Sequence, residues 1–131
     1  MIDCLILGDS IAVGTHMARP ECVSYSKGGI NSSDWNKRYG HNELKAGTVI
    51  ISLGSNDLKG LDTLKELRTL RSTVKGSRVF WILPAIKPAK QQIVNDIAAE
   101  YGDTVLPIRQ LQPDGVHPTG AGYRELANKT K

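Results

Sequence analysis

The sequence predicts an α/β fold in which a five-stranded parallel sheet is packed between two layers of helices, a three-layer α/β/α sandwich. Two observations favour this class. Five short runs rich in Val, Ile and Leu are spread along the chain, and near-continuous apolar runs are typical of parallel strands buried on both faces. Segments with helical features alternate with these runs, which implies right-handed crossover connections.

The predicted elements follow one another in a regular order. The strands are expected at residues 2–7, 22–25, 48–53, 78–83 and 104–108, and the helices at residues 11–18, 33–38, 61–75, 89–101 and 120–129. In the third helix, leucines recur at helical spacing, Asp62 lies near the start and Lys75-Gly76 marks the end. In the fourth helix, Pro88 lies near the first turn, where proline is favoured.

Length and composition predict one globular domain that covers residues 1–131. The hydrophobic content of 40% and the charged content of 23% are ordinary for such a domain. The longest apolar runs are too short for a membrane span, and no export signal is visible at the N-terminus. We therefore expect no membrane span and a cytoplasmic location.

The charge pattern gives no sign of a nucleic-acid partner. The formal net charge of +4 comes from scattered Lys and Arg residues, without a long run of like charges. Only 5% of the residues are aromatic, which leaves no obvious platform for stacking bases. The basic balance is interpreted as surface charge, although it would also suit an anionic substrate.

The two cysteines, Cys4 and Cys22, both lie in apolar, strand-like stretches. The sequence has no Cys-x-x-Cys motif and no Cys/His cluster, so no metal site is expected. Because cysteine is readily buried as a small apolar residue, we interpret the pair as two buried free thiols.

Ser10, Asp114 and His117 together suggest nucleophilic catalysis. Ser10 follows the first predicted strand, and a serine hydroxyl needs a base that takes its proton as it attacks. His117 is a candidate base, and Asp114, three residues earlier, could hold the imidazole in the required tautomer. These three residues form a candidate hydrolase triad.

Further candidate residues follow other predicted strands. The motif Gly28-Gly29 comes after the second strand and Gly54-Ser55-Asn56-Asp57 after the third. Loops that follow parallel strands meet at the carboxyl edge of the sheet. The backbone N–H groups of Ser10 and Gly29 and the amide of Asn56 could there donate hydrogen bonds to a developing oxyanion.

The remaining polar and aromatic residues of interest are given structural roles. Asp9 and Asp57 are expected to hold their loops by hydrogen bonds to nearby N–H groups. His16 and His41 have no carboxylate placed to orient them and are interpreted as surface residues. The two tryptophans, Trp35 and Trp81, are expected to pack in the core or at its rim.

These motifs resemble the conserved blocks of the SGNH (GDSL-type) hydrolase family and occur in the same order. The matching segments are Gly8-Asp9-Ser10, the glycine at 29, Gly54-Ser55-Asn56-Asp57 and Asp114-Gly115-Val116-His117-Pro118. The resemblance implies a flavodoxin-like strand order of 2-1-3-4-5 and a serine esterase mechanism without metal or cofactor. It assigns the nucleophile to Ser10, the base to His117, its orientation to Asp114, and the oxyanion hole to Ser10, Gly29 and Asn56.

The chain departs from the family pattern in two respects. It is short, so that connections are trimmed, most visibly between Gly54 and Pro84. The second block is loose, and Gly28 could take the oxyanion position in place of Gly29. The trimmed connections leave little sequence for a deep acyl tunnel, and polar residues such as Lys27, Asn31 and Gln112 flank the predicted site.

We therefore expect a carboxylic ester hydrolase that cleaves a short acyl group, such as acetyl, from a small-molecule or glycan ester. A lysophospholipase or thioesterase of the same family is the first alternative. A binding module without catalysis and a receiver-like signalling domain are the others, since fold does not fix function. A receiver also needs Ser or Thr after strand four and Lys after strand five, where this chain has Leu83-Pro84-Ala85 and Pro107-Ile108-Arg109-Gln110.

Overall fold

The computed structural model describes residues 2–131, in which five parallel strands form a sheet of order β2-β1-β3-β4-β5. The strands are β1 (Cys4–Gly8), β2 (Val23–Ser26), β3 (Lys45–Ser52), β4 (Lys75–Ile82) and β5 (Thr104–Leu106). Every neighbouring pair of strands is parallel. The predicted α/β class and the 2-1-3-4-5 order are confirmed.

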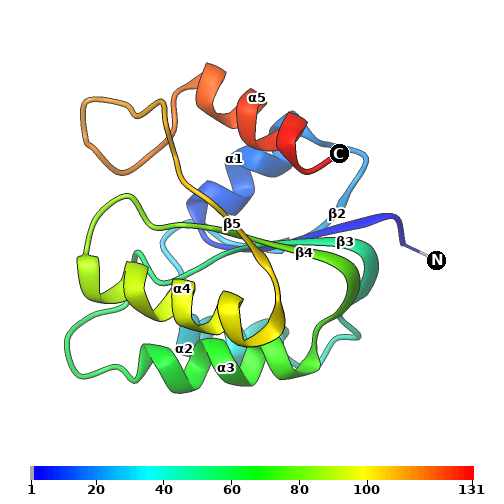
Figure 1. Cartoon of the computed structure of the whole chain (residues 1–131), viewed down its shortest axis with the longest axis vertical. Coiled ribbons are helices and arrows are strands. Elements are labelled where there is room, and N and C mark those ends of the chain that lie inside the picture. The colour runs from blue at the N-terminus through cyan, green and yellow to red at the C-terminus, as the bar shows by residue number, and fades with distance from the viewer. Residues whose placement is uncertain (1) are drawn as a thin grey trace.

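Five helices alternate with the strands: α1 (Ser10–Ala18), α2 (Ser32–Tyr39), α3 (Thr63–Thr73), α4 (Pro88–Tyr101) and α5 (Gly120–Lys129). Figure 1 shows α1 and α5 on one face of the sheet and α2, α3 and α4 on the other. The longest, α4, has 14 residues. Within residues 2–131, no helix combines the length and apolar character needed to cross a membrane.

The core has two parts, one on each face of the sheet. The larger part lies between the sheet and helices α2, α3 and α4, and it includes Trp35, Leu67 and Trp81. Beneath α1 and α5, Ile6, Ile50 and Leu126 belong to the smaller part. Both tryptophan side chains are fully buried, so the core placement expected for Trp35 and Trp81 is confirmed.

The predicted end of the third helix is wrong. The helix ends at Thr73, the backbone of Val74 is extended, and Lys75-Gly76 opens β4 instead of capping the helix. Lys75 pairs with Lys45 and Gly76 with Ala46 across the sheet, and the Lys75 N–H donates to the Leu44 carbonyl. These contacts with a distant strand outweigh the local helix-stop signal.

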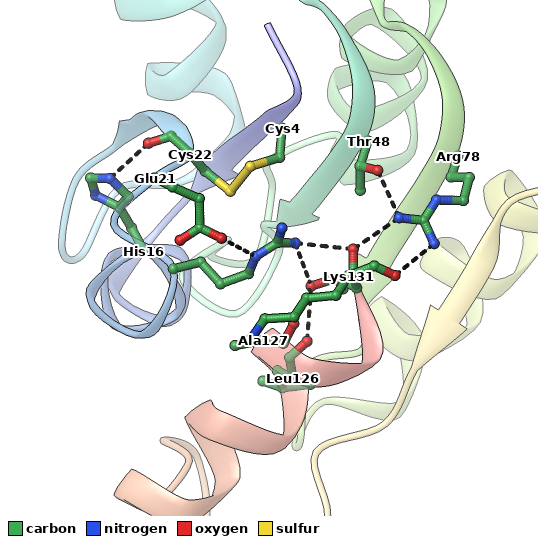
Figure 2. Close-up of polar contacts among 11 residues, drawn as sticks. Cys4, His16, Glu21, Cys22, Thr48, Arg78, Leu126, Ala127 and Lys131 are labelled. Atoms are coloured by element: carbon green, nitrogen blue, oxygen red, sulfur yellow. Dashed lines mark hydrogen bonds and ion pairs between the residues drawn. A yellow bond between two sulfur atoms is a disulfide. The ribbon is translucent and has the colours of Figure 1, made fainter.

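The interpretation of Cys4 and Cys22 as free thiols is also wrong, because the two form a disulfide. Leu5 pairs with Val23 in the parallel register of β1 and β2, so the residues just before them face each other. Their Cα atoms lie 4.9 Å apart, within the range that a disulfide spans. Figure 2 shows the bond beside Glu21 and His16.

The C-terminal residues are held by two arginines, of which Arg78 is labelled in Figure 2 with its dashed bond to Lys131. The buried Arg19 side chain donates to the carbonyl and the hydroxyl of Thr130. Arg78, from β4, donates to the carbonyls of Thr130 and Lys131. The end of α5 is thereby fixed against α1 and the sheet, which anchors the helix that directly follows the His117 loop.

Candidate active site

The position of Ser10 is set by the tight turn between β1 and α1. Gly8 has φ +145°, and a Cβ atom at this position would lie 1.9 Å from the carbonyl oxygen of Ser52, so only glycine fits. Asp9 caps α1 by accepting a hydrogen bond of 3.0 Å from the Ile11 N–H. Ser10 is then the first helical residue, and its own N–H has no partner within the helix.

The structure brings Ser10, His117 and Asp114 into contact. The Ser10 Oγ lies 2.9 Å from His117 Nε2, and His117 Nδ1 lies 2.8 Å from Asp114 Oδ2. A histidine that donates its Nδ1–H to a carboxylate leaves Nε2 free to accept. The imidazole can therefore accept the Ser10 proton, which is the arrangement that activates a serine hydroxyl.

Asp114 is held as a carboxylate by its surroundings. Its Oδ1 accepts hydrogen bonds from the backbone N–H groups of Val116 and His117. These bonds, followed by the bond to the His117 ring, lower the pKa of Asp114 to about 2. The group therefore stays ionised at neutral pH and can stabilise a positive charge on His117.

The loop that presents His117 is braced at its base. The Gln112 N–H donates to the His117 carbonyl, and the Thr119 N–H donates to the Gln110 carbonyl. The Gln112 side chain also donates to the carbonyl of Pro118. These bonds close the loop before α5 begins and fix the backbone on which the imidazole stands.

The turn after β2 offers backbone donors beside Ser10. The Ile30 N–H donates to the Lys27 carbonyl, which leaves the N–H groups of Gly28 and Gly29 outside this turn bond. Gly29 has φ +77°, a conformation that favours glycine. A Cβ atom on Gly28 would lie 4.0 Å from the Ser10 Cβ. Gly28 thus lies next to Ser10, and Gly29 is the following residue of the same turn, so either glycine could take the predicted oxyanion position.

Asn56 lies in the loop after β3 and is tied to the same turn. One hydrogen of its side-chain amide is donated to the Ile30 carbonyl over 3.2 Å. An amide has two N–H donors, so the second remains available for a ligand. The bond to Ile30 fixes the orientation of the amide relative to the Gly28-Gly29 turn.

Asp57 is a buried hub for the loop that contains Asn56. Its carboxylate accepts from the N–H and the hydroxyl of Ser32 and from the hydroxyl of Thr63. The structural role predicted for Asp57 agrees with these contacts, although its partners lie far from it in the sequence as well as near it. The bonds join the loop after β3 to the starts of α2 and α3.

Lys87 is a further contact of this loop that the sequence analysis missed. Its Nζ donates to the carbonyl of Ser55 over 2.7 Å and to that of Asp57 over 3.3 Å, the two residues that flank Asn56. Lys87 has φ +65°, and within residues 2–131 no other non-glycine residue has a positive φ. No sequence signal separates this lysine from the other surface lysines, since the contact spans 30 or more residues.

Asp9 combines a capping role with an unusual protonation equilibrium. It is fully buried, its Oδ1 also accepts from the Ser52 hydroxyl, and its Oδ2 has no hydrogen-bond partner within residues 2–131. Burial raises the pKa of Asp9 to about 6, and the hydrogen bonds from Ile11 and Ser52 offset only part of this effect.

The other two histidines lie outside the Ser10 contact network. His41 is exposed, as expected. His16 is half-buried and its Nε2 contacts the Cys22 carbonyl, so it holds the connection between α1 and β2 rather than lying free on the surface.

One group of side chains has the composition of a metal site. Atoms of Cys4, Glu21 and Cys22 lie within 4.8 Å of one another. Because both sulfurs are joined in the disulfide, neither can act as a thiolate ligand. As long as the disulfide is intact, this group does not fit a metal ion.

Two hollows include residues next to the Ser10–His117 pair, Gly28 in the first and Pro118 in the second. One, of about 440 Å³, is formed by the turn at residues 27–30 and by exposed side chains of α2. The other, of about 600 Å³, lies between α1 and α5 and is more apolar, with Met17, Pro118 and Tyr123 in its walls. The first hollow is distinguished by its charged side chains, which are Lys27, Asp34, Lys37 and Arg38.

Comparison with known proteins shows likeness in structure rather than in sequence. No protein-family model and no curated protein sequence matches this chain. A Bacteroides fragilis protein described as a candidate acylhydrolase superposes with a TM-score of 0.70 and 20% identity, covering 96% of this chain and 83% of that one. The C-terminal catalytic domain of peptidoglycan O-acetyltransferase A from Streptococcus pneumoniae superposes with a TM-score of 0.61 and 18% identity, over 97% and 89% of the two chains.

A two-domain esterase active on acetylated mannans gives a TM-score of 0.64 at 15% identity. This match covers 97% of the present chain and 47% of the esterase. At these identities the likeness concerns the fold. It agrees with the α/β fold that the sequence motifs implied.

Proposed function

We propose that this protein is a serine esterase that hydrolyses short-acyl esters, with acetyl esters of carbohydrates as the preferred class. The observation that supports this most is the chain of contacts from Asp114 through His117 to Ser10, with distances of 2.8 and 2.9 Å. The fold adds support, since structures that share it include an esterase and an acetyltransferase.

In the first half of the reaction, the Ser10 Oγ attacks the ester carbonyl and its proton passes to His117 Nε2. The carbonyl oxygen becomes an oxyanion, which accepts hydrogen bonds from the Ser10 N–H, the N–H of Gly29 and the Asn56 amide. The bond to the alcohol oxygen then breaks, and the His117 proton goes to that oxygen. The alcohol leaves and the acyl group stays on Ser10.

In the second half, water attacks the acyl-enzyme and gives its proton to His117. A second oxyanion forms in the same place and collapses by breaking the bond to the Ser10 Oγ, which takes the proton back. Asp114, ionised at neutral pH, stabilises the imidazolium in both halves. The carboxylic acid is released and the enzyme is restored without metal or cofactor.

The test is the turnover of p-nitrophenyl acetate by Ser10→Ala, His117→Ala and the double variant. Triad members act as a unit, so each single change should lower kcat by several orders of magnitude, roughly 10⁴ or more, and the double variant should be little worse. Circular dichroism and unfolding curves check that each variant is folded. Near-normal turnover by a folded Ser10→Ala protein would end the proposal.

The apolar groove between α1 and α5 favours a second candidate, an esterase or thioesterase for longer acyl chains. Its walls include Met17, which is 79% exposed, and Tyr123. The two candidates differ in the dependence of kcat/KM on acyl length, because each methylene buried there would add about 0.8 kcal/mol of binding. A series of p-nitrophenyl esters from acetate to decanoate decides: a maximum at acetate or butyrate supports the short-acyl proposal, and one at octanoate or beyond contradicts it.

A further inference from the structure

The groove formed by the turn at residues 27–30 and by α2 has a basic lining. Its wall nearest the nucleophile is the turn at residues 27–30, and its outer wall is α2, which contributes Asp34, Lys37 and Arg38. Lys27 lies in the turn itself. The lining therefore has three cationic side chains and one acidic side chain, a formal charge of +3 − 1 = +2.

No carboxylate within residues 2–131 forms an ion pair with these three cations, Lys27, Lys37 and Arg38. Arg19, Arg68 and Arg71, in contrast, each pair with a carboxylate. The carboxylate of Asp34 is engaged by the Asn31 amide. All three cationic side chains are exposed and can reach a ligand in the groove.

One wall of the groove, the turn at residues 27–30, lies next to Ser10 and Asn56. A Cβ atom on Gly28, in this wall, would lie 4.0 Å from the Ser10 Cβ. The Ile30 carbonyl in the same wall accepts a hydrogen bond from the Asn56 side-chain amide. A substrate whose ester lies at Ser10 would therefore have the turn at residues 27–30, and the groove that this turn lines, beside its alcohol part. Its volume of about 440 Å³ is enough for one or two sugar units.

We propose that the groove binds the anionic part of the substrate, and that the preferred substrate is an ester of an acidic carbohydrate bearing a carboxylate close to the acylated sugar. This inference rests on the proposed function, since it names the charge of the alcohol part of the ester. Lys37 and Arg38 are specificity-determining residues in this account. Arg38 offers the planar, forked donor set that suits a carboxylate, and Lys37 adds a second positive charge.

Binding is tested first, with Ser10→Ala protein so that no probe is cleaved. The probes are trigalacturonate and its neutral trimethyl ester, titrated by calorimetry or by NMR shifts. Trigalacturonate should bind about 3- to 10-fold more tightly, the effect expected of two or three exposed charge contacts. Raising NaCl from about 10 mM to about 0.1 M, which shortens the Debye length from about 30 to about 10 Å, should reduce this preference.

Two double variants, made in the same Ser10→Ala background, locate the effect. Lys37→Gln/Arg38→Gln should remove most of the preference for the acidic trisaccharide, since only Lys27 then remains of the three cations. Lys45→Gln/Lys75→Gln removes the same charge from two exposed lysines at the amino ends of β3 and β4, opposite the site, and should retain it. Equal binding of the two trisaccharides by the Ser10→Ala protein would overturn the inference. So would an equal loss of the preference for trigalacturonate in the two double variants.

Turnover separates this inference from the proposed function. The ratio of kcat/KM for acetylated galacturonate to that for acetylated galactose should fall about 3- to 10-fold in Lys37→Gln/Arg38→Gln protein with Ser10 intact. Ser10-dependent hydrolysis of both esters, with no binding preference and no change in this ratio, refutes only the anionic groove. Hydrolysis that survives Ser10→Ala refutes the proposed function, while the binding result still decides on the groove.

Discussion

Asp114 and Asp9 are two carboxylates of the same site whose surroundings move their pKa values in opposite directions. The hydrogen bonds to Asp114 lower its pKa to about 2, and burial raises that of Asp9 to about 6. The lowered pKa adds stability that is present above about pH 4 and is lost as the pH falls toward 2. The raised pKa of Asp9 has the opposite effect on stability. As the pH rises, Asp9 loses its proton at a lower pH in the unfolded chain than in the folded one, so the folded state becomes less stable.

For Asp9, the free energy of unfolding is therefore expected to fall as the pH rises from about 4 to about 6, by up to about 3 kcal/mol. Asp9→Asn should remove this dependence, since an amide does not ionise and its oxygen can still accept from Ile11 and Ser52. Urea unfolding of the wild type and the variant across this pH range is the measurement. Parallel curves for the two proteins would show that Asp9 does not titrate in the folded state as described.

The sequence was sufficient to predict that His117 meets Ser10, because both motifs follow strands and the carboxyl ends of parallel strands meet at one edge. It was not sufficient to predict what holds those motifs in place. The bonds from Ser32 and Thr63 to Asp57, and from Lys87 to Ser55, join different loops and leave no local pattern. The burial that raises the pKa of Asp9 is likewise a property of the packed fold.

At the scale of elements, the start of α4 supports the loop after β3. Lys87, the N-cap position of α4, makes no side-chain cap bond to its own helix and donates instead to the carbonyls on both sides of Asn56. The left-handed backbone conformation of Lys87 costs on the order of 1 kcal/mol or more. From this position the side chain reaches the loop after β3. We infer that Lys87 is a positioning residue for the Asn56 amide.

Lys87→Met keeps the aliphatic stem and loses both hydrogen bonds, so kcat should fall about tenfold with little change in KM, as for a weakened transition-state contact. Asn56→Ala should cost on the order of 10²–10³ in kcat. The double variant should be no worse than Asn56→Ala alone, because Lys87 acts through Asn56.

The matched control is Lys90→Met, which loses a bond to the Thr63 hydroxyl but none to the residues beside Asn56. It should leave kcat unchanged. Additive losses in the Lys87→Met/Asn56→Ala double variant would show that Lys87 affects the enzyme by some route other than Asn56.

Element boundaries also show where local signals stop being informative. All five predicted helices and all five strands are present, and α5 has the predicted bounds. The error at Lys75-Gly76 arose because these two residues pair with β3 through the sheet. A rule for helix ends considers only local sequence and cannot include this pairing. The disulfide was missed for the same reason, since the register of β1 against β2 decides that the two cysteines meet.

At the scale of the whole molecule, the disulfide joins Cys4, the first residue of β1, to Cys22, which directly precedes β2. It therefore lies at the amino end of β1, whereas Ser10 follows the carboxyl end. Disulfides persist mainly in oxidising compartments, and the cytoplasmic location expected from the N-terminus stays a prediction. Closing a loop between cysteines 18 residues apart should stabilise the fold by about 3 kcal/mol through the entropy of the unfolded chain.

Cys4→Ala/Cys22→Ala protein should therefore lose about 3 kcal/mol of unfolding free energy, while kcat of the folded variant stays unchanged. Urea unfolding with and without dithiothreitol gives the comparison, and the reduced wild type should be destabilised to a similar extent. Thiol titration of the unfolded, unreduced wild type is the control. Two reactive thiols there would show that the disulfide does not form.

The central claim, that Ser10 is a nucleophile activated by His117, is tested most directly by covalent labelling with a serine-directed fluorophosphonate. Intact-mass and peptide analysis should find one adduct per chain, on the peptide that contains Ser10. Ser10→Ala protein should show none, and His117→Ala protein should react far more slowly. A non-catalytic binding module or a receiver-like domain would not react. Absence of an adduct on the folded wild type, or equal labelling of Ser10→Ala, would contradict the account.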